Sequence, residues 1–200
     1  MNSGFSSSEV MKQVVEEAVQ DSSNNLKVIG KMTGAADVHD GTVKITSTPI
    51  AATTTGLIDL RPETIRVSYK IIKDGSHEIT YNNIYAGMLA GESYSSLKDA
   101  VAAAKQKGLI KTNPLVDSEK PDTTSAFIYW VINQNMDKYV ENNEMINLVM
   151  IYADKDRPAT AEYIEIDVIE PEGSLLHIER TIPNVSSSVL DLGGKVKSGH

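Results

Sequence analysis

The chain has 200 residues and no cysteine, with 40% hydrophobic residues and a formal net charge of −8. This length suits about one to one and a half domains, and the apolar content is enough for a core and too high for a disordered chain. The absence of cysteine excludes a disulfide framework, cysteine-bound zinc, iron–sulfur clusters and thiol nucleophiles. The excess of acid disfavours binding to the phosphate backbone of nucleic acids.

The longest apolar run is the seven-residue segment Ala126 to Ile132. A membrane-spanning helix needs about 20 apolar residues, and a signal peptide has an apolar core of about 7–15 residues near the N-terminus. The chain as given contains neither, so we expect it to be soluble.

An amphipathic helix is predicted near the N-terminus. Ser6 and Glu9 have the spacing of a capping box, in which each side chain satisfies a free backbone N–H at the helix start. Apolar residues then recur at helical spacing, namely Met11, Val14, Val15, Ala18 and Val19. A helix of about 14 residues is marginal alone in water, so we expect this stripe to pack against a partner.

The segment from Leu26 to about Tyr85 is predicted to form strands. Apolar residues alternate with polar ones from Ile65 to Ile71, and Asp74-Gly75 separates this run from Glu78–Tyr81. Asp-Gly between two such runs is typical of a tight β-hairpin, because both turn positions need a positive φ. Val43–Thr46 is a shorter alternating strand, and we assign Ala51–Gly56 to a loop.

One further helix is predicted in the middle of the chain. Ser95 or Ser96 can cap it, one face is lined by Leu97, Ala100, Val101 and Ala104, and Gly108 ends it. The polar segment Lys111–Ser125, which contains two prolines, is expected to be a long surface loop.

The C-terminal half is again rich in strands. The predicted strands are Phe127–Ile132, Ile146–Tyr152, Ile164–Val168 and a strand containing Leu176 and Ile178. Many short strands with few helices favour an antiparallel sandwich or barrel. We therefore divide the chain into a helical segment at 1–25, a β-domain at 26–192 and a small, basic, tag-like tail at 193–200.

No catalytic motif is found around the four histidines, which are His39, His77, His177 and His200. Glycine-rich phosphate loops and the Gly-x-Ser-x-Gly elbow of hydrolases are also absent from the sequence. We therefore interpret the histidines as surface residues and predict that the protein is not an enzyme and has no small-molecule substrate.

Two kinds of candidate site remain. The acidic loop residues Asp117, Glu119 and Asp122 are the best candidates for a divalent metal such as Ca²⁺, which takes 6–8 oxygen ligands. Solvated loop charge is the simpler interpretation of these carboxylates and of the pairs Glu141/Glu144 and Asp154/Asp156. Asn184-Val185-Ser186 is the single N-glycosylation sequon, and it matters only if the protein is exported.

The last seventy residues of the β-domain resemble the C-terminal part of archaeal flagellins, the archaellins. That family has a strand and polar loop, a second strand, a turn with proline and glycine, a closing segment of apolar–acidic–x–Thr–x–Pro type and a short apolar end. In this chain these features are Phe127–Ile132, Glu144–Tyr152, Glu170–Gly173, Ile178–Pro183 and Val189–Leu192.

The front of the chain is similar to the same family. Val10–Asn25 leads into Leu26–Gly30 as the end of the archaellin helix leads into a strand, and Gly56–Leu60 precedes the strand at Ile65–Ile71. Archaellins begin with a short basic leader and an apolar helix, where this chain has Met1–Phe5. We therefore expect this chain to be the soluble outer domain of an archaellin from which the N-terminal core helix has been removed. The resemblance implies an immunoglobulin-like β-sandwich, which agrees with the strand pattern.

The resemblance implies a structural protein outside the cell, namely a subunit of the archaellum, the rotating filament used for swimming. The stripe from Met11 to Val19 would face the filament core, copies of the chain would associate, and only the missing helix would enter a membrane. Some archaellins carry N-glycans or bind metal, which would apply here to Asn184 and the acidic loops. Two alternatives stay open: an accessory stator protein of the archaellum or an adhesion pilin that binds the cell envelope, and an enzyme of unknown type.

Overall fold

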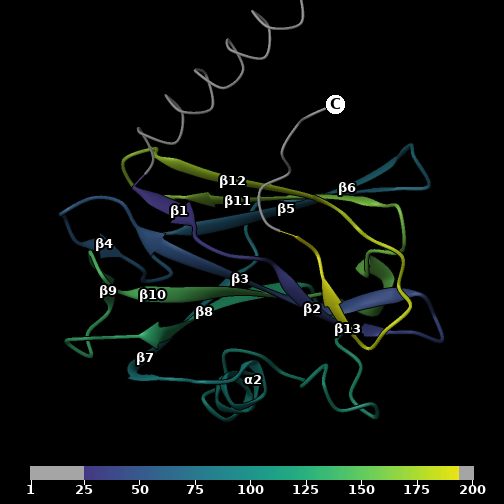
Figure 1. The fold of residues 1–200 in the computed structure, drawn as a ribbon, viewed down its shortest axis with the longest axis horizontal. Helices are drawn as coiled ribbons and strands as arrows, with labels where there is room; N and C mark the ends of the chain where they lie inside the picture. Colours follow the sequence, from purple (N-terminus) through teal and green to yellow (C-terminus); the bar gives the residue numbers. More distant parts are fainter. Residues whose placement is uncertain (1–24, 194–200) are drawn as a thin grey trace, which may run out of the picture.

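A computed structural model of the chain describes residues 25–193, and its elements form three layers. Figure 1 shows a four-stranded sheet at the top, a seven-stranded sheet beneath it, and helix α2 (Leu97–Gln106) at the bottom. The prediction of a mostly β, mainly antiparallel sandwich with one helix in this part of the chain is confirmed. An immunoglobulin-like arrangement of its strands stays a prediction.

The larger sheet has the strand order β13-β2-β3-β10-β8-β7, with β1 also pairing with β3. Its strands are β1 (Leu26–Val28), β2 (Thr33–Asp37), β3 (Thr42–Ala52), β7 (Tyr85–Ser93), β8 (Ser125–Ile132), β10 (Met145–Ile151) and β13 (Val189–Asp191). One pair departs from the antiparallel prediction, because β7 runs parallel to β8. Parallel neighbours need a crossover connection, and α2 with the loop after it supplies that crossover.

The smaller sheet has the order β12-β11-β5-β6 and is antiparallel throughout. Its strands are β5 (Arg66–Lys73), β6 (His77–Tyr81), β11 (Tyr163–Ile169) and β12 (Leu175–Thr181). A two-stranded ribbon of β4 (Ile58–Asp59) and β9 (Tyr139–Val140) and a 3₁₀ turn at Asp154–Asp156 complete the described elements.

Both predicted hairpin turns are present in the smaller sheet. Asp74 and Gly75 join β5 to β6 with φ values of 50° and 73°, as a tight hairpin requires. Gly173 has a φ of 85° in the β11–β12 turn, and its N–H donates to the carbonyl of Glu170 (3.0 Å). These two turns set the register that brings side chains of neighbouring strands opposite one another.

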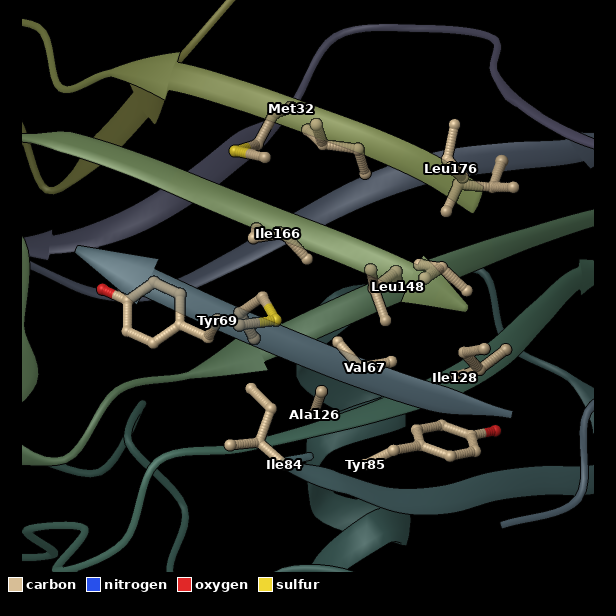
Figure 2. Close-up of a cluster of buried hydrophobic side chains, with 14 of the residues drawn as sticks. Met32, Val67, Tyr69, Ile84, Tyr85, Ala126, Ile128, Leu148, Ile166 and Leu176 are labelled. Carbon is tan, nitrogen blue, oxygen red and sulfur yellow. The ribbon is translucent and has the colours of Figure 1, made fainter. Parts of the chain in front are cut away.

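The main core lies between the two sheets (Figure 2). Val67 and Tyr69 of β5 and Ile166 of β11 are fully buried there, and they meet Ile128 and Leu148 of the larger sheet. Alternate residues of each strand in the smaller sheet enter this layer, while the others face outward. Removal of this apolar surface from water is the main force that holds the sheets together.

A second core lies between the larger sheet and α2. Ala100, Val101 and Ala104 of the helix pack in one cluster with Phe127 and Tyr129 of β8. The intervening residues Ala126, Ile128 and Trp130 of β8 belong to the main core. Strand β8 is thus covered on both faces, which explains why its apolar run does not alternate with polar residues.

Ser96 rather than Ser95 caps helix α2. Its Oγ accepts the N–H of Asp99 (3.1 Å), which satisfies one of the free donors at the helix start. We expect Ser96→Ala to lower the free energy of unfolding by about 1 kcal/mol in urea denaturation. Ser95→Ala, at the exposed neighbouring position, is the matched control and should leave the midpoint unchanged. Equal losses in the two variants would contradict this assignment.

Three parts of the sequence prediction are corrected or lie outside the structure. Ala51 and Ala52 belong to β3 rather than to a loop, because β1 pairs with them at Lys27 and Leu26. Strand β2 lies in the segment predicted to form strands but was not located within it, and β7 was not predicted, since their glycine and alanine residues have low strand propensity. The predicted N-terminal helix, with Met11, Val14, Val15, Ala18 and Val19, and the tail after residue 193 lie outside the described residues.

Within residues 25–193, no helix combines the length and apolar character needed to span a membrane.

Candidate functional site

Two of the histidines lie apart from any acid–base partner. His39 is exposed in the β2–β3 turn, where its backbone N–H donates to Asp37 Oδ1 (3.0 Å). His77 is exposed at the first position of β6. Within residues 25–193, neither imidazole makes a side-chain hydrogen bond that could orient it as a general base.

His177 lies on the outer face of the smaller sheet, between two carboxylates. Its Nδ1 is 2.5 Å from Asp167 Oδ1 on β11, and its Nε2 is 2.8 Å from Glu179 Oε1 on β12. The outward position was predicted, but the partners were missed. The signal was present in the sequence, because a tight turn at Glu170–Gly173 places Asp167 directly opposite His177 and the period of two places Glu179 beside it.

The charges of this cluster affect one another. Partial burial alone would lower the pKa of His177, but the hydrogen bonds to Asp167 and Glu179 outweigh it and raise the pKa above the usual 6.5. The same contact with His177, together with the Tyr163 hydroxyl, lowers the pKa of Glu179. Asp167 also accepts a hydrogen bond through Oδ2 from the Ser68 hydroxyl on β5 (3.2 Å), so it holds His177 on one oxygen and Ser68 on the other.

The three acidic residues proposed for a metal have separate partners. Glu119 accepts hydrogen bonds from Lys105 Nζ (2.5 Å) and from the N–H of Asn113 (2.7 Å), which tie the loop after α2 to the end of the helix. Asp117 is 98% exposed and 3.4 Å from Lys44 Nζ, and Asp122 accepts from Thr123. No cluster of three metal-binding side chains occurs in the part of the chain that the structure describes. Calcium binding at these residues stays a prediction.

The interpretation of the acidic pairs as solvated loop charge is wrong for Glu144 and for Asp156. Glu144 is 2% exposed and accepts hydrogen bonds from the backbone N–H groups of Gln134 and Glu141. Asp156 is only 1% exposed, and its Oδ2 accepts hydrogen bonds from Tyr81 OH (2.8 Å) and Thr124 Oγ1 (2.7 Å). The hydroxyl of Tyr69 donates to its carbonyl oxygen (3.3 Å). A buried carboxylate needs such donors, so Asp156 joins β5, β6 and the start of β8 into one polar cluster.

The chain enters the sandwich at a point that is bound to both sheets. Asn25 donates from its side chain to Glu170 Oε2 (2.9 Å) and from its backbone to Ser174 Oγ (3.4 Å), both in the β11–β12 turn. Its carbonyl accepts the N–H of Thr53 at the end of β3 (2.7 Å). Asn25 therefore joins the β11–β12 turn of the smaller sheet to the end of β3 in the larger sheet.

Asn184 is exposed in the extended segment between β12 and β13, and its carbonyl accepts the N–H of Ser186 (3.0 Å). Exposure makes the side chain accessible to a modifying enzyme. Glycosylation at this residue stays a prediction.

Comparison with known proteins identifies the fold. No family model and no curated protein matches the sequence. The crystal structure of archaeal flagellin FlaB1 from Methanocaldococcus jannaschii is similar, with a TM-score of 0.60 and 16% identity over 85% of this chain and 97% of that chain. The archaellin-like fold predicted from the sequence resemblance is thus confirmed.

Two further structures are less similar. The archaeal flagellum of Methanospirillum hungatei strain JF1 has a TM-score of 0.43 and 11% identity, over 90% of this chain and 78% of that chain. The archaellum periplasmic stator protein FlaG from Sulfolobus acidocaldarius has a TM-score of 0.34 and 5% identity, over 76% of this chain and 99% of that chain. Both scores are too low to define a common fold with this chain.

Proposed function

We propose that this chain is the outer β-domain of a subunit of the archaellum filament, with a structural rather than a catalytic role. The observation that carries the proposal is the similarity to archaeal flagellin FlaB1, which extends over 97% of that chain. The sandwich would lie outside the cell and pack against β-domains of neighbouring copies. A glycan at Asn184 belongs to the same proposal, because the residue is exposed.

The entry point at Asn25 supports this proposal physically. A filament subunit must transmit force between the segment in the filament core and the domain on the surface. Asn25 donates a hydrogen bond to Glu170 and accepts one from the N–H of Thr53, which connects that junction to both sheets, so a load would be shared by the whole sandwich.

Assembly tests the proposal. A chimera with an archaellin core helix joined before Ser6, made in an archaeon that lacks its own filament subunit, should form filaments visible by electron microscopy. We expect Val15→Asp in this chimera to prevent assembly, because Val15 belongs to the predicted apolar stripe. Gln13→Asp, on the opposite face of the same predicted helix, is the matched control and should still assemble.

Two results would contradict the filament role. A chimera that is folded and exported but forms no filaments and co-purifies with cell-envelope protein would favour an accessory stator protein or an adhesion pilin. Turnover of a substrate that is lost with His39→Gln or His177→Gln would instead support an enzyme.

A further inference from the structure

The outer face of the smaller sheet is uncovered within the described chain and carries a dense set of charges. Strands β11 and β12 contribute Glu165, Asp167 and Glu179 to this face. The other charged or titratable side chains on it are His177 and Tyr163 from the same strands, Arg66 and Lys70 from β5, and Glu78 from β6. Acidic side chains outnumber lysine and arginine on this face, so the protonation of His177 reduces its net negative charge.

The hydrogen-bond geometry of His177 requires two N–H donors. Its two ring nitrogens lie 2.5 and 2.8 Å from carboxylate oxygens of Asp167 and Glu179, which only accept hydrogen bonds when ionised. A neutral imidazole has one N–H and one acceptor nitrogen, so it can satisfy just one of the two carboxylates. Both contacts exist together only when the ring is protonated on both nitrogens and carries a positive charge.

We propose that His177 is a proton-dependent clamp between strands β11 and β12, closed when the imidazole is charged and open when it is neutral. The clamp acts at a strand that is easily detached, because among the described residues β12 is an edge strand and pairs with β11 alone. The inference stands on this hydrogen-bond geometry and does not depend on the filament role.

The charges around His177 increase the effect of its protonation on the β11–β12 pair. Glu165 and Glu179 are directly opposite each other on the two strands, an arrangement of like charges that weakens a strand pair. Lys70 Nζ lies 3.3 Å from Glu165 and partly offsets this repulsion. When His177 loses its proton, Asp167, Glu165 and Glu179 remain side by side with Lys70 as the nearest counter-charge.

The direction of the pH effect follows from linkage. The pKa of His177 in the folded protein is raised, so the folded state binds the proton more tightly than the unfolded chain does. The stabilisation is fully present below the unfolded pKa of 6.5 and is lost as the pH rises through the folded pKa. The β11–β12 hairpin, whose turn also binds Asn25, is therefore held more firmly in acid than in alkali.

Nuclear magnetic resonance of the imidazole tests the clamp directly. We expect His177 to titrate above 6.5 and to carry protons on both ring nitrogens below that pH. Asp167→Asn and Glu179→Gln should each lower the pKa of His177, while Glu172→Gln, in the turn of the same hairpin, should leave it unchanged. A pKa at or below 6.5, or one that Glu179→Gln does not lower, would overturn the proposal.

A second measurement tests whether protonation of His177 stabilises the pairing of β11 and β12 or leaves the stability unchanged. Between about pH 6 and about pH 9, the urea midpoint and the exchange protection of β12 amides, corrected for intrinsic exchange, should fall more in the wild type than in His177→Gln. His77→Gln, an exposed histidine on β6, should keep the full fall. An identical fall in the wild type and His177→Gln would exclude a clamp.

Discussion

Replacing Asp156 with alanine is expected to lower the free energy of unfolding by about 3 kcal/mol, because buried hydroxyl groups that lose their acceptor cost roughly 1–3 kcal/mol each. The variant leaves the hydroxyls of Tyr81 and Thr124 without the carboxylate that now accepts from both. Water cannot readily replace the carboxylate at Thr124, which is 5% exposed, so most of the loss arises there rather than at the half-buried Tyr81. Urea denaturation followed by the fluorescence of Trp130, the single tryptophan of the chain, measures the loss.

A matched control and a double mutant sharpen this test. Asp117→Ala removes a fully exposed carboxylate and should change the free energy of unfolding by less than about 0.5 kcal/mol. The double variant Asp156→Asn/Tyr81→Phe should be more stable than the sum of the single losses predicts, because the two groups share one hydrogen bond. Additive losses, or equal losses for Asp156→Ala and Asp117→Ala, would show that the cluster does not stabilise the fold.

Local patterns in the sequence were sufficient for most of the smaller sheet. The Asp74-Gly75 turn and the Glu170–Gly173 turn each connect two short strands, and pairing of neighbours along the chain needs no long-range information. The larger sheet is different, because β3 pairs with β10 and β2 pairs with β13, which come from distant parts of the sequence. Strand β7 was missed because its glycine-rich sequence adopts a strand through pairing with β8 rather than through intrinsic preference.

The difference between local and long-range contacts also explains which site residues could be predicted from the sequence. The surroundings of His177 could have been predicted from the hairpin register, since Asp167 and Glu179 lie within ten residues of it. The environment of Asp156 could not, because Tyr81 and Thr124 come from other parts of the chain and meet it only after both sheets form. Its carboxylate is indistinguishable in sequence from the exposed one of Asp117.

Truncating Phe127 to alanine is expected to cost about 3–5 kcal/mol, although α2 forms only a thin layer over the larger sheet. Phe127 is fully buried among residues of the helix and of β10, so its removal leaves a cavity in the second core. Ile128→Ala should cost about 2–5 kcal/mol at the next position, because Ile128 is buried on the opposite face of β8 in the main core. Urea denaturation followed by far-ultraviolet circular dichroism measures both.

The pair of substitutions tests whether β8 is buried on both faces. In a strand covered on one face, one of two neighbouring residues would be exposed, and its truncation would change stability by less than about 0.5 kcal/mol. Ile132→Ala, at the end of the same strand where the side chain is 47% exposed, supplies that reference value. A loss at Phe127 no larger than at Ile132 would mean that α2 does not seal the outer face. Large losses at both neighbours would establish that the helical crossover is an integral layer of the fold, since within residues 25–193 it is α2 and its loop that cover the Phe127 side of β8.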